Sequence, residues 1–247
     1  MLPGKLAFVT GAGGGIGRAV CHLMAREGAT VVAADLNLNN VESTVADLTG
    51  TYAGKGHKSY QLDVSNTESV SSVLKQVFTD YSAPPTVVVN AAGITRDNFM
   101  LKMSVEDFES VFNVNVKGTF LVTQTICKEL VEKNLSGSIV NIGSIVAQRG
   151  NKGQCNYAAS KAAVEVFSKT VSLEMARYNI RCNTVLPGFT VTPMTEIIPD
   201  KVKEYFKSVI PLNRFAESDE IAEVVTFLAS EKSSYITGTS IAVSGGF

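Results

Sequence analysis

Two side chains that can exchange a proton, Tyr157 and Lys161, stand four residues apart in the run Asn156-Tyr-Ala-Ala-Ser-Lys161. The spacing of Ala, Val, Leu and Met over residues 154–178 predicts a helix, and this helix places both side chains on one face. A phenol has an ordinary pKa of about 10, and an ammonium group fixed beside it stabilises the phenolate and lowers that pKa. The pair is therefore a candidate acid/base catalyst. The same spacing also fits an ordinary pair of surface side chains.

A glycine-rich string, Thr10-Gly-Ala-Gly-Gly-Gly-Ile-Gly17, lies between a strand pattern and a helix pattern. Glycines at this place allow a tight turn and let the backbone approach a pyrophosphate at the amino end of the helix. The string therefore predicts a dinucleotide site, although a purely structural turn uses the same residue types. The expected cofactor contacts in the string are Gly11, Gly13, Gly15, Ile16 and Gly17.

Asp35 ends the second strand pattern, twenty residues after Gly15. A carboxylate at that point accepts hydrogen bonds from the adenosine ribose hydroxyls and repels a 2′-phosphate, so NAD(H) is expected rather than NADP(H). Asp35 is also compatible with a role as a helix cap or turn residue. Arg18 is a candidate phosphate contact, which leaves use of both cofactors open.

These residues must be positioned by a larger framework, and β-branched runs alternate with helical patterns along all 247 residues. That alternation predicts an α/β fold: one doubly wound (Rossmann) domain over residues 1–247, with a seven-stranded parallel sheet covered by helices on both faces. The expected strands are residues 6–10, 30–35, 59–63, 86–90, 138–143, 181–186 and 240–243. The expected helices are residues 16–27, 41–48, 68–78, 105–132, 154–178 and 219–229.

One segment, residues 190–215, holds Pro193, Pro199 and Pro211 and interrupts this rhythm. It is expected to be either a substrate loop over the site or a plain surface connection.

Composition excludes several other classes of function. The 22 Lys and Arg residues nearly balance the 23 Asp and Glu residues, so neither nucleic acid nor a membrane surface is an expected partner. The four cysteines form no CxxC pair and the chain has only two histidines, so no metal site is expected. The first strand pattern starts within ten residues and leaves no room for a signal peptide, which favours a reducing compartment.

With these motifs in place, the chain from residue 5 to residue 246 resembles the short-chain dehydrogenase/reductase family. The resemblance implies a catalytic set of Asn115, Ser144, Tyr157 and Lys161. It also implies adenine contacts at Asp63 and Val64, a support for the sheet beside the cofactor at Asn90, Ala91 and Gly93, and nicotinamide contacts at Pro187, Gly188 and Thr192. Tyr157 and Lys161 are then expected at the nicotinamide ribose as well.

The chemistry implied is proton transfer coupled to hydride transfer. A substrate carbonyl oxygen would lie between the Ser144 and Tyr157 hydroxyls, Tyr157 would give the proton, and Lys161 would lower the pKa of Tyr157. Asn115 would hold a water in the proton path. Each residue also has a structural alternative: Ser144 as a helix cap, Asn115 as a buried amide at a helix kink, and Lys161 as a solvated charge.

Two longer stretches, 90–103 and 210–238, resemble β-ketoacyl-acyl-carrier-protein reductases within this family. Residues 28–35, 84–89, 117–124 and 180–189 look most like the animal estradiol 17-beta-dehydrogenases of that branch. This likeness implies an acyl thioester or steroid substrate and the mitochondrial matrix as the location, with the cytosol as the alternative. Carrier-protein docking is in doubt, because Arg177 is the one basic residue directly before Ile180.

The patterns at 105–132 and 154–178 carry apolar residues on more than one helix face, which favours an assembly unless the sheet covers both helices. By resemblance the assembly is a homotetramer, or a heterotetramer with a second short-chain reductase. Phe99, Phe189 and Met194 are expected to line an apolar substrate site. Three hypotheses follow: an NAD-linked 3-hydroxyacyl/3-oxoacyl thioester oxidoreductase, a hydroxysteroid dehydrogenase, and a cofactor-binding subunit of a catalytic partner.

Overall fold

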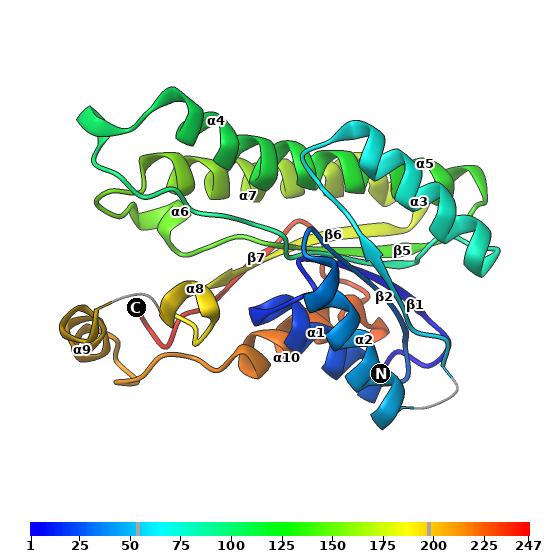
Figure 1. Cartoon of the computed structure of the whole chain (residues 1–247). Helices are drawn as coiled ribbons and strands as arrows, with labels where there is room; N and C mark the ends of the chain where they lie inside the picture. The colour runs from blue at the N-terminus through cyan, green and yellow to red at the C-terminus, as the bar shows by residue number, and fades with distance from the viewer. Residues whose placement is uncertain (53–54, 197–198) are drawn as a thin grey trace.

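The computed structural model describes residues 1–52, 55–196 and 199–247 and shows a layered α/β fold (Figure 1). Its centre is a seven-stranded sheet in the order β3-β2-β1-β4-β5-β6-β7, and every pairing in it is parallel. The strands are β1 (Leu6–Thr10), β2 (Thr30–Asp35), β3 (Lys58–Gln61), β4 (Val87–Asn90), β5 (Gly137–Ile142), β6 (Ile180–Pro187) and β7 (Ser240–Val243). The predicted fold class and sheet are confirmed.

The sheet reverses its direction of growth at β1. The chain passes from β1 to β2 and β3 at one edge, then returns to β4 on the other side of β1, where Thr10 pairs with Asn90. Ligands of doubly wound sheets bind at the carboxyl ends of the strands at such a reversal. The turn that follows Thr10 and the segment that follows Asn90 therefore lie side by side at this edge.

Helices cover both faces of the sheet (Figure 1). One apolar core packs α1, α2 and α10 against one face, and the second packs α3, α5 and α7 against the other. Neighbouring residues of β1 divide between the two cores, with Val9 in the first and Phe8 in the second. This explains why the strand is apolar without alternation, because it is buried on both sides. The main helices are α1 (Gly15–Arg26), α2 (Leu38–Thr51), α3 (Thr67–Tyr81), α4 (Val105–Phe112), α5 (Thr119–Glu132), α7 (Cys155–Met175) and α10 (Ser218–Ala229).

The helix predicted at 105–132 is confirmed in its bounds, because α4, a π-helical stretch and α5 follow one another without a break from Val105 to Glu132. Between α4 and α5 lies a stretch of π-helix, Asn113–Gly118, whose wider turn follows no 3.6-residue apolar pattern. The backbone there passes close to the segment after β3, since a Cβ on Gly118 would lie 2.7 Å from Cγ2 of Val64. The π-helix includes Asn115, one of the predicted catalytic residues.

The segment 190–215 also contains regular structure that the prediction missed. It holds the short helix α8 (Pro193–Glu196) and the longer α9 (Asp200–Val209), which lie near α6 (Val146–Arg149) and the C-terminal label in Figure 1. Val202, Phe206 and Val209 recur at helical spacing, a signal that the flanking prolines obscured. In the part of the chain that the structure describes, no helix is long and apolar enough to cross a membrane.

Candidate active site

Lys161 lies on α7, and its side chain is buried at 4% exposure. Its Nζ donates a 2.7 Å hydrogen bond to the carbonyl of Ile142 at the end of β5 and stands 5.6 Å from the centre of the Tyr157 ring. Burial lowers the pKa of Lys161 to about 8. A surface pair and a solvated lysine are both incompatible with this geometry, so these alternatives are wrong.

Tyr157 lies one turn earlier on the same helix and is half-buried. Burial raises the pKa of Tyr157 to about 12; the nearby Ser144 hydroxyl lowers it, and the carboxylate of Asp97 raises it further. The sequence-based expectation of a lowered phenol pKa is therefore wrong for the chain by itself. The physical reason is that loss of solvation destabilises the phenolate more than its neighbours stabilise it.

Ser144 follows β5 directly and is held between the sheet and α6. Its Oγ accepts a 3.3 Å hydrogen bond from the backbone N–H of Val146, and its own position is fixed because Ile145 N–H donates to the carbonyl of Pro187 at 3.1 Å. The structural alternative for Ser144, a helix cap, is wrong, because Ile145 is the N-cap of α6 and Ser144 belongs to the turn before it. The same hydroxyl is close enough to the phenol of Tyr157 to lower its pKa.

Asn115 joins three elements from inside the π-helix. Its Oδ1 accepts from the N–H of Ile94 at 2.9 Å, and its Nδ2 donates to the carbonyl of Ile94 at 3.1 Å and to Oγ of Ser160 at 2.9 Å. The side chain thus connects the segment after β4 to α7. Its alternative role, a buried amide at a helix irregularity, is present in this structure, and the predicted water stays a prediction.

The glycine turn after β1 has no room for a side chain where its backbone approaches other backbone atoms. Gly11 has a φ of +66°, and a Cβ there would lie 2.7 Å from the backbone nitrogen of Ala92. A Cβ on Gly17 would collide with the carbonyl oxygen of Gly11. The first turn of α1 is thereby drawn against the strand end, which leaves its amino end open for a pyrophosphate.

Asp35 faces this turn from the end of β2. One carboxylate oxygen accepts the N–H of Gly13 and the other accepts the N–H of Asn37, both at 2.9 Å. Asp35 is therefore a turn residue, as its structural alternative proposed, and it also points at the glycine turn where a ribose would lie. Arg18, the candidate phosphate contact, is paired with Asp47.

The remaining predicted residues lie along the same edge of the sheet. Thr192 stands over the glycine turn, because a Cβ on Gly15 would lie 3.3 Å from its Cγ2. A Cβ on Gly93 would lie 3.3 Å from Nζ of Lys161. The structure therefore brings the residues predicted for the cofactor and for catalysis to one place. The others at or near this edge are Ile16, Asp63, Val64, Asn90, Ala91, Pro187 and Gly188.

A buried polar chain behind this edge was not predicted. Asn90 Nδ2 donates to Asn141 Oδ1 at 2.8 Å, and Asn141 Nδ2 donates to Ser168 Oγ at 2.8 Å, which connects β4, β5 and α7. The available signal was an asparagine inside the apolar run Ile139-Val-Asn141-Ile. A buried amide must find partners, and here it fixes neighbouring elements relative to each other. The side-chain oxygen of Asn90, Oδ1, is buried and accepts no hydrogen bond from the residues that the structure describes.

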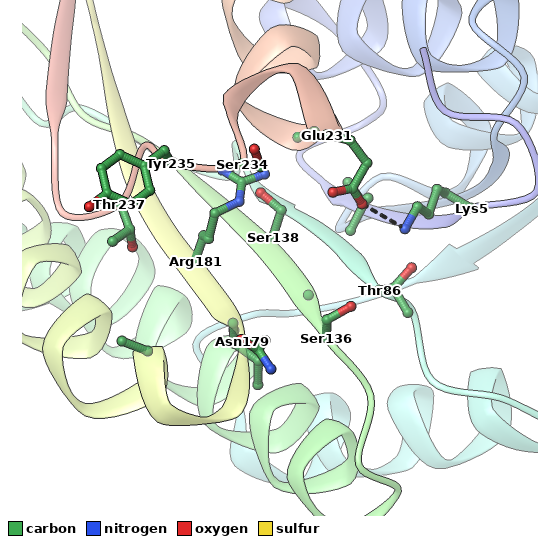
Figure 2. A pocket seen from close by; sticks show the side chains of 15 residues that line it. Lys5, Thr86, Ser136, Ser138, Asn179, Arg181, Glu231, Ser234, Tyr235 and Thr237 are labelled. Atoms are coloured by element: carbon green, nitrogen blue, oxygen red, sulfur yellow. Dashed lines mark hydrogen bonds and ion pairs between the residues drawn. The ribbon is translucent and has the colours of Figure 1, made fainter.

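A cavity of about 430 Å³ lies at the opposite, amino end of the sheet (Figure 2). Its charged groups are already engaged: Lys5 pairs with Glu231 at 3.1 Å, and the Arg181 guanidinium donates to the carbonyls of Ser230 and Ile236. None of the predicted catalytic or cofactor residues lines it. The chemistry therefore belongs at the carboxyl edge and not in this cavity.

Comparisons with known proteins show what the chain is similar to. A family model described as Enoyl-(Acyl carrier protein) reductase matches residues 11–247. The chain is 50% identical over 250 residues to the human (3R)-3-hydroxyacyl-CoA dehydrogenase, covering 99% of this chain and 96% of that protein. It is 46% identical over 245 residues to the 3-oxoacyl-[acyl-carrier-protein] reductase FabG of Thermotoga maritima, covering 99% and 98%. A short-chain type dehydrogenase/reductase from Mycobacterium marinum superposes with a TM-score of 0.92 at 31% identity, covering 99% and 96%.

A doubly wound sheet with a glycine turn, a serine, a tyrosine and a buried lysine at its carboxyl edge defines an oxidoreductase that acts on hydroxyl and keto groups with a nicotinamide cofactor, NAD(P)(H). The chain belongs to the short-chain dehydrogenase/reductase family. Its substrate is accordingly a small molecule.

Proposed function

We propose that this protein interconverts 3-hydroxyacyl and 3-oxoacyl thioesters with NAD(H), using Tyr157 as the acid or base. The observation that carries the proposal is the buried Lys161 beside Tyr157 and near Gly93, in the segment after β4 that approaches the glycine turn at Gly11. The names of the human and Thermotoga relatives supply the substrate class.

The residues present fit a dinucleotide. The backbone cradle at Gly11 and Gly17 would be filled by any Cβ, and the amino end of α1 opens toward it. Asp35 would hold the adenosine ribose, while Tyr157 and Lys161 would hold the nicotinamide ribose. The bound nicotinamide supplies the hydride chemistry.

In the mechanism that we infer, two hydroxyls meet the substrate oxygen. Ser144 donates a hydrogen bond to it, and Tyr157 transfers its proton as negative charge develops during reduction. In oxidation Tyr157 accepts the proton, which requires a phenolate. Burial opposes that phenolate, and the ammonium of Lys161, 5.6 Å from the centre of the Tyr157 ring, would offset part of the raised pKa.

The proposed preference for NAD(H) rests on Asp35 and on the ion pair of Arg18 with Asp47. Asp35 presents a carboxylate where a 2′-phosphate would lie, and Arg18 is held by Asp47 and so is drawn away from a phosphate. We expect Asp35→Ala to raise the ratio of kcat/KM for NADPH to that for NADH by about tenfold or more. Asp47→Ala is the matched control, because it frees Arg18 from its ion pair and leaves Asp35 in place. An unchanged ratio in Asp35→Ala would defeat the ribose assignment.

The proposal includes an assembly, a homotetramer or a heterotetramer with a second short-chain reductase. Phe108 of α4, Phe120 of α5, and Val166 and Leu173 of α7 remain exposed, so the sheet does not cover these helices fully. Sedimentation of the purified chain tests this point. The mitochondrial matrix is the proposed location by likeness, with the cytosol as the alternative.

The deciding experiment measures NADH oxidation with acetoacetyl-CoA beside NAD reduction with estradiol, with Tyr157→Phe as the blank in both. We expect kcat/KM for the thioester to exceed that for the steroid by more than about tenfold, which equals about 1.4 kcal/mol in transition-state binding. The reverse ratio would identify a steroid dehydrogenase. Turnover that appears only with an added second subunit would identify a cofactor-binding partner.

A further inference from the structure

Four phenylalanines from distant parts of the sequence form one aromatic cluster beside the site. Phe189 is the centre of this cluster: its ring lies 4.1 Å from that of Phe206, 5.2 Å from that of Phe215 and 5.8 Å from that of Phe247. Phe206 and Phe247 also meet edge to face at 6.2 Å. Phe206 is on α9, so the cluster attaches this helix to the segment that follows β7.

Phe247 has a second contact, with the segment that follows the catalytic serine. The guanidinium carbon of Arg149, the last residue of α6, lies 4.2 Å from the centre of the Phe247 ring. The ring thus lies between α6 and α9, and Figure 1 shows the chain end labelled C between the same two helices. A cation placed over an aromatic face is attractive, and aromatic pairs at these distances stabilise one another.

The cluster borders the place where a substrate chain would extend. Phe189 directly follows Gly188, one of the predicted nicotinamide contacts, and the next residues leave Val191 and Met194 exposed at 44% and 45%. On α9, Tyr205 is exposed at 63% beside the clustered Phe206, with their rings 5.5 Å apart. Apolar side chains therefore continue from the cofactor edge onto one face of α9, which is suited to an alkyl chain.

We propose that Phe247 is a specificity-determining residue that holds α9 against α6 and so forms the apolar wall for the acyl chain of the substrate; this inference rests on the proposed function. Phe247 acts through Phe206 and Phe189 and is a positioning residue. Removal of its ring takes away the contacts that fix α9, while Ser144, Tyr157 and Lys161 keep their own hydrogen bonds. The effect should therefore grow with the length of the acyl chain, because each further methylene that packs against this wall buries more apolar surface.

The test compares acetoacetyl-CoA with 3-oxooctanoyl-CoA in three variants. In Phe247→Ala we expect the ratio of kcat/KM for the longer to the shorter substrate to fall about tenfold, mainly through KM, with the Kd of NADH within about twofold of the wild type. Phe247→Tyr keeps the ring and should keep the ratio. Tyr235→Ala removes an exposed ring at the opposite end of the sheet (Figure 2) and is the matched control.

Limited trypsin digestion provides a readout that needs no turnover. Lys201, Lys203 and Lys207 lie on α9, so cleavage there should become at least about fivefold faster in Phe247→Ala than in the wild type or Tyr235→Ala. Equal losses for both thioesters, or unchanged cleavage of α9, would overturn the proposal. Absence of thioester turnover in the wild type would instead refute the proposed function, and with it the acyl wall, whereas the digestion would still decide whether Phe247 holds α9.

Discussion

Replacement of Lys161 by methionine should remove activity and, at neutral pH, stabilise the fold. The structure buries Lys161 and lowers its pKa from 10.5 to about 8. A difference of about 2.5 pKa units corresponds to a cost of about 3 kcal/mol for holding the charged side chain at pH 7. The lost hydrogen bond to the Ile142 carbonyl offsets about 1 kcal/mol of this gain. We therefore expect the free energy of unfolding of Lys161→Met at pH 7 to exceed that of the wild type by about 2 kcal/mol.

The sign of the pH dependence follows from the lowered pKa. Between about pH 8 and pH 10.5 the unfolded chain binds more protons at Lys161 than the folded chain does. The contribution of Lys161 to the free energy of unfolding therefore rises with pH over that window, and it is lost as the pH drops through 8. The advantage of Lys161→Met should therefore shrink, from about 2 kcal/mol at pH 7 to roughly zero at pH 9.5.

Urea unfolding of the NADH-free protein, followed by far-ultraviolet circular dichroism at both pH values, measures this difference. Lys169→Met is the matched control, because Lys169 lies two turns further along α7 with its side chain half exposed at 51% and pairs with Glu165. The control should change stability by less than about 0.5 kcal/mol with no such window. A Lys161→Met variant that is no more stable than the wild type at pH 7, or whose advantage is the same at pH 9.5, would refute the reasoning.

Three further outcomes are expected. Gly17→Ala places a Cβ against the Gly11 carbonyl and should lower the thermal midpoint of the cofactor-free protein by about 4–8 °C. Gly14→Ala is the control, because a Cβ there meets nothing within 4 Å, and it should leave the midpoint unchanged. Similar midpoints for the two variants would contradict the close approach of Gly17 to Gly11. Asp97→Asn removes a carboxylate that raises the pKa of Tyr157, so the rise of the oxidation rate with pH should move to lower pH in a kcat/KM profile, and a shift to higher pH would be inconsistent with this contact. Asn115→Ala removes the three hydrogen bonds of a buried amide and should destabilise the chain by about 2–3 kcal/mol in urea unfolding. A loss of activity without loss of stability would favour a purely catalytic role.

The sequence alone predicted the architecture well because its signals are local. Glycines after the first strand, apolar runs buried on two sides and helical spacing each depend on residues close in sequence, and the seven strands were found with ends within two residues. The helix at 105–132 was found with its correct ends, but the π-helix around Asn115 was not predicted, because no local signal indicates it. The helix α9 was missed although Val202, Phe206 and Val209 have the required spacing, because prolines on either side suggested a loop.

The sequence by itself thus determined the fold class and led to a prediction of the reacting side chains, which their motifs place at the ends of strands and on one helix face. Only the tertiary structure decided their electrostatics and their partners. It buried Lys161 against Ile142, raised the pKa of Tyr157, and joined Phe189, Phe206 and Phe247. The reason is physical: a pKa depends on solvation and on charges brought from distant segments, and the aromatic cluster depends on contacts between residues 17 to 58 positions apart, so neither is encoded in local spacing.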